Sequence, residues 1–177
     1  MEKYKRRMAR FVDYLLVPPN AVQTNRTITL PPSRPSLQMT PAIGLWQPFA
    51  SLVAFNLKTI ETRLRPTNIR GRIIICATRK VAPNDLYQRT LHRIANSGND
   101  CNAFHPTVVP VGVMLCSCEL VDCRQMVDAD ERRALVDKTD ENGRPRWAWM
   151  LENIVQLPRT PVKCGQGWFY IDETKLA

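Results

Sequence analysis

A run of β-branched residues over Arg72–Thr78 constrains the fold of this chain more than any other segment. Three successive isoleucines leave no polar face, a pattern that is typical of a strand buried inside a protein. Val111–Val121 is expected to form a second long strand. The longest apolar stretches are therefore strands, and all of them are too short to span a bilayer.

The residue pattern before Arg72 predicts a short strand followed by a helix. Ala42–Leu45 is expected to be the strand, and Pro48 suits the first turn of a helix. Apolar residues then recur at helical spacing. Asn56 follows them, and asparagine tolerates the left-handed backbone with which many helices end. We expect a helix over about 48–56.

The rest of the chain adds short elements around these strands. Residues 83–110 are expected to be a polar insert and residues 127–138 a charged helix. Further strands are expected over 147–151, after the Asn142-Gly143 turn, and over Trp168–Ile171. Several short strands with two or three helices favour an α+β fold, a compact mixed β-barrel, over a doubly wound sheet.

Residues 1–41 differ in composition from the rest of the chain. Five of the first ten residues are Lys or Arg, and residues 18–41 hold six of the fourteen prolines. We expect a short basic helix and a proline-rich arm there, and one domain over 42–177. A flexible arm packed loosely on the domain is favoured over a basic arm that follows phosphates.

The chain has a formal charge of +9 and a pI of about 9.6, which favours polyanionic partners such as RNA. No segment has the pattern of a signal peptide, so we expect an intracellular protein, cytoplasmic if bacterial or phage-encoded, with no membrane partner. Its six cysteines include no CxxC pair, so buried thiols are favoured over disulfides or a metal site. We expect neither metal nor cofactor.

Several ordered blocks resemble the ASCH domain, a family named after the human activating signal cointegrator. The family pattern runs roughly QPWAxL, then GxKxxExR, then RG before an apolar strand. Asn56 stands where the family has Gly before the Lys, and Cys164 interrupts a later Lys-Gly. The matching blocks are Gly44–Leu52, Lys58–Arg63, Arg70–Ile75, Pro110–Met114, Trp147–Asn153 and Pro161–Trp168.

This resemblance implies a PUA-like barrel with a cleft between the barrel and a helix. Relatives bind RNA or read modified bases, and some are small hydrolases, either amidohydrolases of N4-acetylcytidine or ribonucleases. The function expected is thus binding of RNA or a nucleotide, with a hydrolase as the alternative. The resemblance carries over Lys58, Glu61 and Arg63, with Trp46 and Gln47 beside them, and Lys163 lies in its last block. Arg65 and Arg70 belong to a run of seven basic residues from Lys58 to Lys80, expected to form a phosphate-facing rim rather than a basic solvent face without a partner. The nucleotide-binding residues expected are thus Trp46, Gln47, Lys58, Glu61, Arg63, Arg65, Arg70 and Lys163.

The central residues of this set lie on the alternating segment Thr59–Arg63. Alternation places Ile60 on one face and Glu61 with Arg63 on the other, just after Lys58. Spacing alone favours a solvated ion-pair cluster. With the family blocks added, the same charges are expected to form the floor of a pocket. There Glu61 accepts from a base, while Arg63 or Lys58 holds a phosphate or carbonyl oxygen.

The hydrolase alternative would use Lys58 and Glu61 as catalytic residues without a metal, on a modified nucleoside or single-stranded RNA. The amidohydrolase branch has Thr three residues after its Lys, where this chain has Glu61. That difference weakens the transfer of its mechanism. His92 and His105 match no family motif and are expected on the surface. Of the four tryptophans, Trp46 is the best candidate for stacking on a base.

Overall fold

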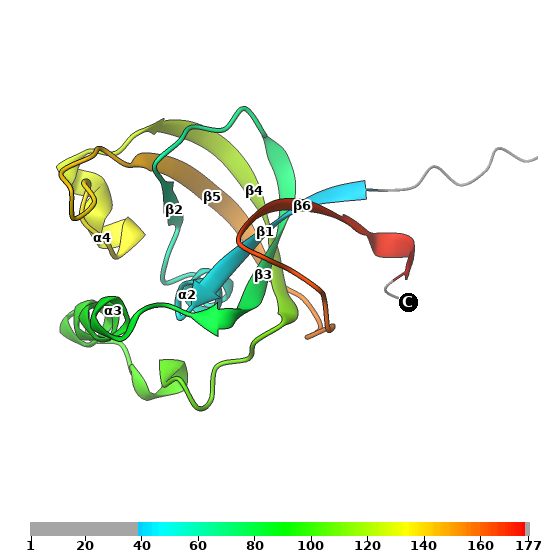
Figure 1. Cartoon of the computed structure of the whole chain (residues 1–177), viewed down its shortest axis with the longest axis horizontal. Helices are drawn as coiled ribbons and strands as arrows, with labels where there is room; N and C mark the ends of the chain where they lie inside the picture. Colours follow the sequence, from blue (N-terminus) through cyan, green and yellow to red (C-terminus); the bar gives the residue numbers. More distant parts are fainter. Residues whose placement is uncertain (1–38, 176–177) are drawn as a thin grey trace, which may run out of the picture. The chain divides into compact units, whose positions relative to one another are not determined.

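The structure is a computed structural model that describes residues 39–175, drawn as a coloured ribbon in Figure 1. The chain divides into two units, residues 1–36 and 37–177, and every described residue belongs to the second. The predictions for residues 1–38, the basic helix and most of the proline-rich arm, lie outside the described residues.

The core of the described part is one six-stranded mixed sheet in the order β2-β5-β4-β3-β1-β6. Only β1 and β3 pair in parallel, and all other neighbours pair antiparallel. Every segment predicted as a strand lies in this sheet. The strands are β1 (Met39–Gln47), β2 (Ile60–Arg63), β3 (Gly71–Val81), β4 (Val113–Gln125), β5 (Trp147–Gln156) and β6 (Gly167–Asp172).

The helices are few and short, and none in the described residues is long and apolar enough to cross a membrane. The helix predicted over 127–138 is wrong in length, because Leu135 adopts a left-handed backbone with φ of 59° that ends it. The insert 83–110 contains a helix of 13 residues that was not predicted. The helices are α2 (Phe49–Ala54), α3 (Asn84–Asn96) and α4 (Glu131–Ala134), with 3-10 turns at Asn102–Phe104, Asp128–Asp130 and Glu173–Lys175.

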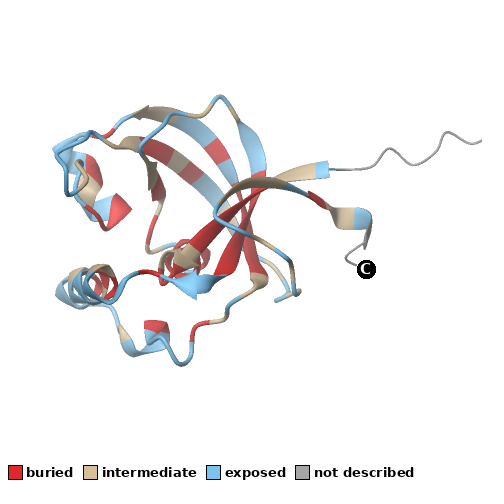
Figure 2. Cartoon of the chain, in the orientation of Figure 1, coloured by how far each residue is buried: buried red, intermediate tan, exposed pale blue. Residues whose placement is uncertain are grey.

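The isoleucine run forms the middle of β3 and is buried on both faces (Figure 2). Ile73 and Ile75 pack with Val53 of α2 in the main core. Ile74 packs on the other face of the sheet with Ile171 of β6. Because both faces are covered, an uninterrupted apolar strand is stable in this position.

Helix α2 packs against β1, β3, β4 and β5 and buries residues 50–54. It ends at Ala54, two residues before the predicted end, but Asn56 just beyond it has the predicted left-handed backbone, with φ of 58° and its N–H donating to the carbonyl of Val53. The chain therefore turns sharply at Asn56 and enters β2, an edge strand of the sheet that α2 covers.

The α+β class, a mixed sheet with a few helices, is confirmed, but the sheet does not close into a barrel. Its two edges are β2 and β6, which share no ladder in the described residues. Side chains of Glu61 and Arg63 from β2 and of Trp168 from β6 occupy the space between the edges.

A close approach of two glycines fixes the segment that precedes β6. A Cβ on Gly44 would lie 1.9 Å from the carbonyl oxygen of Gly165. The backbone of residue 165 can therefore lie directly on β1 only because residue 44 has no side chain.

We predict that Gly44→Ala lowers the free energy of unfolding by about 1–3 kcal/mol, because the new methyl group must displace the backbone of Gly165. Gly165→Ala is the control, since an added Cβ there has nothing within 4 Å, and a change below about 1 kcal/mol is expected. Urea unfolding checks both. Equal stability of the two variants would contradict the role of the close approach.

We also propose that the domain folds without residues 1–36. Strand β1 begins at Met39, and Met39–Pro41 pair with β6, so a deletion must stop before this strand. A chain of residues 37–177 should melt at nearly the temperature of the full chain. Deletion through residue 43 removes the buried Ala42 and Ile43 and should abolish cooperative melting. Equal loss of stability in both truncations would show that the first unit stabilises the second.

Candidate functional site

A cavity of about 600 Å³ lies where the sheet fails to close. Both edge strands line it, and we call it the edge cavity. Its volume is within the usual range for small-molecule sites. Helix α2 contributes Phe49, and β5 contributes Trp149. From β1, β2 and β6 it is lined by Ile43, Leu45, Trp46, Glu61, Thr62, Arg63, Gly167 and Trp168.

The charged groups of the edge cavity are mostly basic. The only acid among the described lining residues is Glu61, against four cations. Such an excess raises the local concentration of anions. The cations are Lys58, Arg63, Arg65 and Arg146.

The ammonium group of Lys58 is buried, with a side chain only 1% exposed. Its Nζ donates to the carbonyl oxygens of Ile60 and, at 2.8 Å, of Ala134, and lies 3.5 Å from Glu61 Oε2. Burial lowers the pKa of Lys58, and Glu61 partly opposes this effect. All three ammonium hydrogens thus have acceptors in the protein. In this arrangement Lys58 ties β2 to the end of α4.

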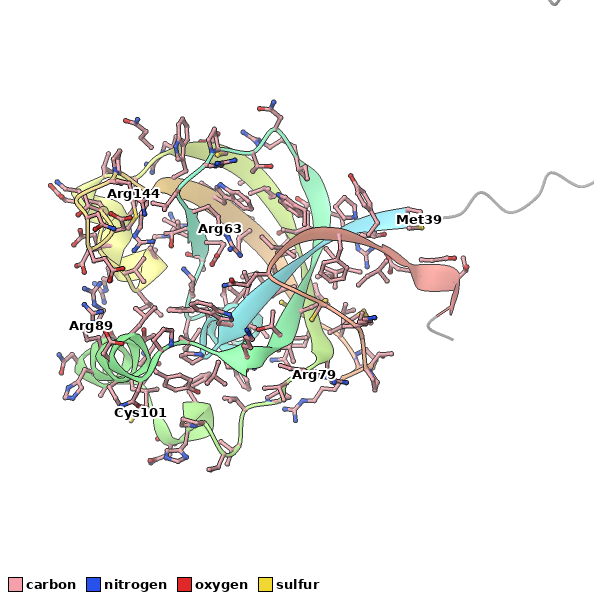
Figure 3. The ribbon with its side chains drawn as sticks, in the orientation of Figure 1. Met39, Arg63, Arg79, Arg89, Cys101 and Arg144 are labelled. Atoms are coloured by element: carbon pink, nitrogen blue, oxygen red, sulfur yellow. The ribbon has the colours of Figure 1, made fainter. Side chains whose placement is uncertain are left out.

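The carboxylate of Glu61 lies between two cations. Its Oε1 is 3.1 Å from Arg63 Nε, and Oε2 faces Lys58. The Arg63 Nε–H is not aligned for a hydrogen bond in the described residues, so the contact is ionic. Each carboxylate oxygen retains acceptor capacity. The Arg63 side chain is 24% exposed, and Figure 3 shows it beside β2.

Two indoles form an aromatic wall beside these charges. Trp149 stacks on Trp168 with centroids 5.3 Å apart, and Arg63 Cζ lies 6.0 Å from the Trp149 ring centroid. Trp149 is directly opposite Glu61 in the β2–β5 ladder. Its buried Nε1–H has no hydrogen-bond partner among the described residues. A buried donor in a cavity wall is typical of a place where a ligand or water supplies the acceptor.

The comparison with family models gives one match, the ASCH domain, over residues 43–155. This match covers more than half of the chain. The chain belongs to the ASCH domain family. The matched residues run from the middle of β1 to the end of β5 but for its last residue, and include Lys58, Glu61, Arg63 and Trp149 but not β6.

No curated protein matches this ASCH domain protein. Among solved structures it is similar to an ASCH protein from Zymomonas mobilis, with 20% identity, a TM-score of 0.45, and coverage of 70% of this chain and 73% of that chain. A tyrosine-to-phenylalanine variant of the Zymomonas mobilis protein gives 17% identity, a TM-score of 0.46, and coverage of 77% and 94%. A serine-to-alanine variant of the same protein gives 16% identity, a TM-score of 0.45, and coverage of 77% of this chain and 92% of that chain. A likeness at this level identifies no site residues.

The edge cavity brings together five of the eight residues predicted from sequence in this ASCH domain: Trp46, Lys58, Glu61, Arg63 and Arg65. Neither Gln47 nor Arg70 lines the edge cavity or the second cavity described below. Lys163 lines that second cavity.

The Gln47 side chain links β1 to the start of α2 and to the segment before β4 in the ASCH domain. Its side chain is fully buried, donates from Nε2 to the Pro110 carbonyl at 2.6 Å and accepts from the Ser51 N–H at 3.1 Å. The exposed Arg70 bonds to the carbonyls of its own loop and lies 3.7 Å from Asp122. We therefore leave both residues out of the proposed contact set.

Among the lining residues of the edge cavity that were not predicted are two cationic or amide side chains, Arg146 and Gln166, and two indoles, Trp149 and Trp168. The alternation of Trp147 and Trp149 and the strand over Thr59–Arg63 were both predicted, but the pairing between the two strands was not. Both histidines are exposed, as expected. All six cysteines are free, and burial raises the pKa of Cys76 and of Cys118 to about 12. No group of three metal-ligating side chains occurs in the described residues.

We predict that Lys58→Met destabilises the domain by about 3–5 kcal/mol, because it leaves Glu61 and two carbonyl groups without the buried ammonium. Arg70→Met is the matched control, since it removes an exposed ion pair and should cost less than about 1 kcal/mol. Urea unfolding measures both. A Lys58→Met variant as stable as Arg70→Met would rule out the tethering role.

Proposed function

We propose that this ASCH domain binds single-stranded RNA and holds one nucleotide unit in the edge cavity. The observation that carries the proposal is the combination of one buried carboxylate, partly exposed indoles and an excess of cations in a single cavity. Unstacked bases of RNA are recognised by aromatic faces and hydrogen bonds to base edges, and their phosphates by basic groups.

The residues divide into roles by exposure. Trp46 and Trp168 are half-buried and would stack on the base. Glu61 faces the cavity with free acceptor capacity and would accept from an exocyclic amine. Arg63 and the exposed Arg65 would hold phosphate or carbonyl oxygens. Adenine, cytosine and guanine carry amino groups and uracil does not, so the site should discriminate against uracil.

Hydrolysis by Lys58 and Glu61 gains no specific support from the geometry. A general base needs a free lone pair, and a lysine reaches that state when it is neutral. Burial does lower the pKa of Lys58, but its Nζ contacts two carbonyl oxygens and Glu61. These acceptors all favour a fully protonated donor, so we put binding before catalysis.

We predict that Arg63→Gln weakens binding of single-stranded RNA by about ten- to a hundredfold, because it removes a charged donor from a partly desolvated site. Arg65→Gln should act more weakly, affect all sequences alike, and flatten the dependence on salt. Glu61→Gln should reduce discrimination between cytidine and uridine oligomers. The measurement is fluorescence anisotropy over a salt series.

Arg132→Gln serves as the control, because Arg132 is exposed and lines neither cavity. Melting temperatures confirm that each variant folds. If the Arg63 and Glu61 variants bind every oligomer as the control does, the edge cavity is not the site. Product analysis of the same samples, for cleaved RNA or cytidine released from N4-acetylcytidine, tests the hydrolase alternative, which requires the activity to be lost in Lys58→Ala.

A further inference from the structure

A second cavity of about 820 Å³ adjoins the first, and we call it the outer cavity. It lies between the ends of β1 and β3 and the segment before β6. Its described lining residues include three cations and no acid. They are Trp46, Thr78, Arg79, Lys80, Gly112, Pro161, Val162, Lys163, Cys164, Gly165 and Gln166.

Trp46 and Gln166 line both cavities and so form a shared wall. Both belong to segments with fixed positions. Trp46 lies in β1, and Gln166 follows the residue that packs against Gly44. The two cavities are therefore neighbouring compartments on either side of a half-buried indole, not unrelated hollows.

The cations of the outer cavity are not neutralised within the described part of the chain. Arg79, Lys80 and Lys163 are exposed and form no ion pair with a described carboxylate. In contrast, Arg70 and Arg72, near the other end of β3, pair with Asp122 and Glu173. Figure 3 shows Arg79 beside the end of β3. Unpaired cations in a concave surface attract an anionic ligand.

We infer that the outer cavity binds the backbone phosphate that links the nucleotide in the edge cavity to its neighbour. This inference rests on the proposed function. The recognised unit is then a strand of at least two nucleotides that passes over Trp46, with bases able to stack on the indole. An acidic peptide would satisfy the cations, but a nucleotide strand also supplies bases that stack on the indole between the two cavities, so we favour the nucleotide strand.

The test compares ligands of increasing length: cytidine and adenosine, their 3′- and 5′-monophosphates, and the dinucleoside monophosphates. Each is titrated calorimetrically against the full chain, the double variant Arg79→Gln/Lys163→Gln, and the control Arg89→Gln/Arg132→Gln. The control removes the same charge from two exposed arginines that line neither cavity.

The wild type should bind at least one phosphate-bearing ligand more tightly than the nucleoside. The Arg79→Gln/Lys163→Gln variant should weaken that ligand by roughly tenfold, because two exposed ion pairs are lost. It should bind the nucleoside as the wild type does, and the control should bind both ligands normally.

Four results would overturn the inference. If dinucleotides bind no more tightly than nucleosides, or if the gain persists in the double variant, the outer cavity holds no linking phosphate, while the proposed function stands. If polyglutamate displaces the dinucleotide from the outer cavity but not the nucleoside from the edge cavity, and binds as tightly, the outer cavity is a docking site for an acidic peptide. If no nucleoside or oligonucleotide binds the wild type at low salt, the proposed function fails as well.

Discussion

The buried ammonium of Lys58 is the contact on which the arrangement of the edge cavity depends. It reaches its place because Asn56 ends α2 with a left-handed turn, after which the Lys58 N–H donates to Leu52 of the same helix. The side chain then joins β2 to α4 and holds the Glu61 carboxylate. Burying an ion pair adds little net stability, but removing one partner is costly, so such a pair enforces a position more than it strengthens the fold. That position aims Glu61 at the cavity.

The same carboxylate limits the electrostatics of the cavity. Glu61 is shared by Lys58 and Arg63, so it balances part of their charge and leaves Arg65 and Arg146 uncompensated. The open edge of the sheet has a related consequence. Because β2 and β6 share no ladder in the described residues, the carboxylate and the indole wall between them line an open cavity within reach of a ligand. In this ASCH domain the cavity therefore lies at the place where the sheet does not close into a barrel.

Local patterns in the sequence predicted those structural features that depend only on residues close together in the chain. Alternation placed Glu61 and Arg63 on one face, and the asparagine at the end of α2 was identified correctly. The pairing of Glu61 with Trp149 joins residues far apart in the chain, and no periodicity encodes it. Gln47 was predicted at the cleft because its amide matched a family motif, yet Pro110, 63 residues on, takes its donor. Helix α3 was missed although Tyr87, Leu91 and Ile94 have helical spacing, so that signal was available.

The fate of the basic run shows why charge read along a sequence is not charge on a surface. The run from Lys58 to Lys80 was expected to form one phosphate-facing rim, but β3 carries its second half. At about 3.3 Å per residue, Arg72 and Arg79 are separated by roughly 23 Å along the strand. Arg72 therefore meets Glu173 at one end of the sheet, while Arg79 lines the outer cavity at the other. Arg146 also lines the edge cavity, and no local count includes it, because it directly precedes Trp147, the residue that pairs with Arg63 in the β2–β5 ladder. The distribution of cations into two compartments is thus set by strand length and pairing, and the proposed function uses it to bind one base and one phosphate at separate places.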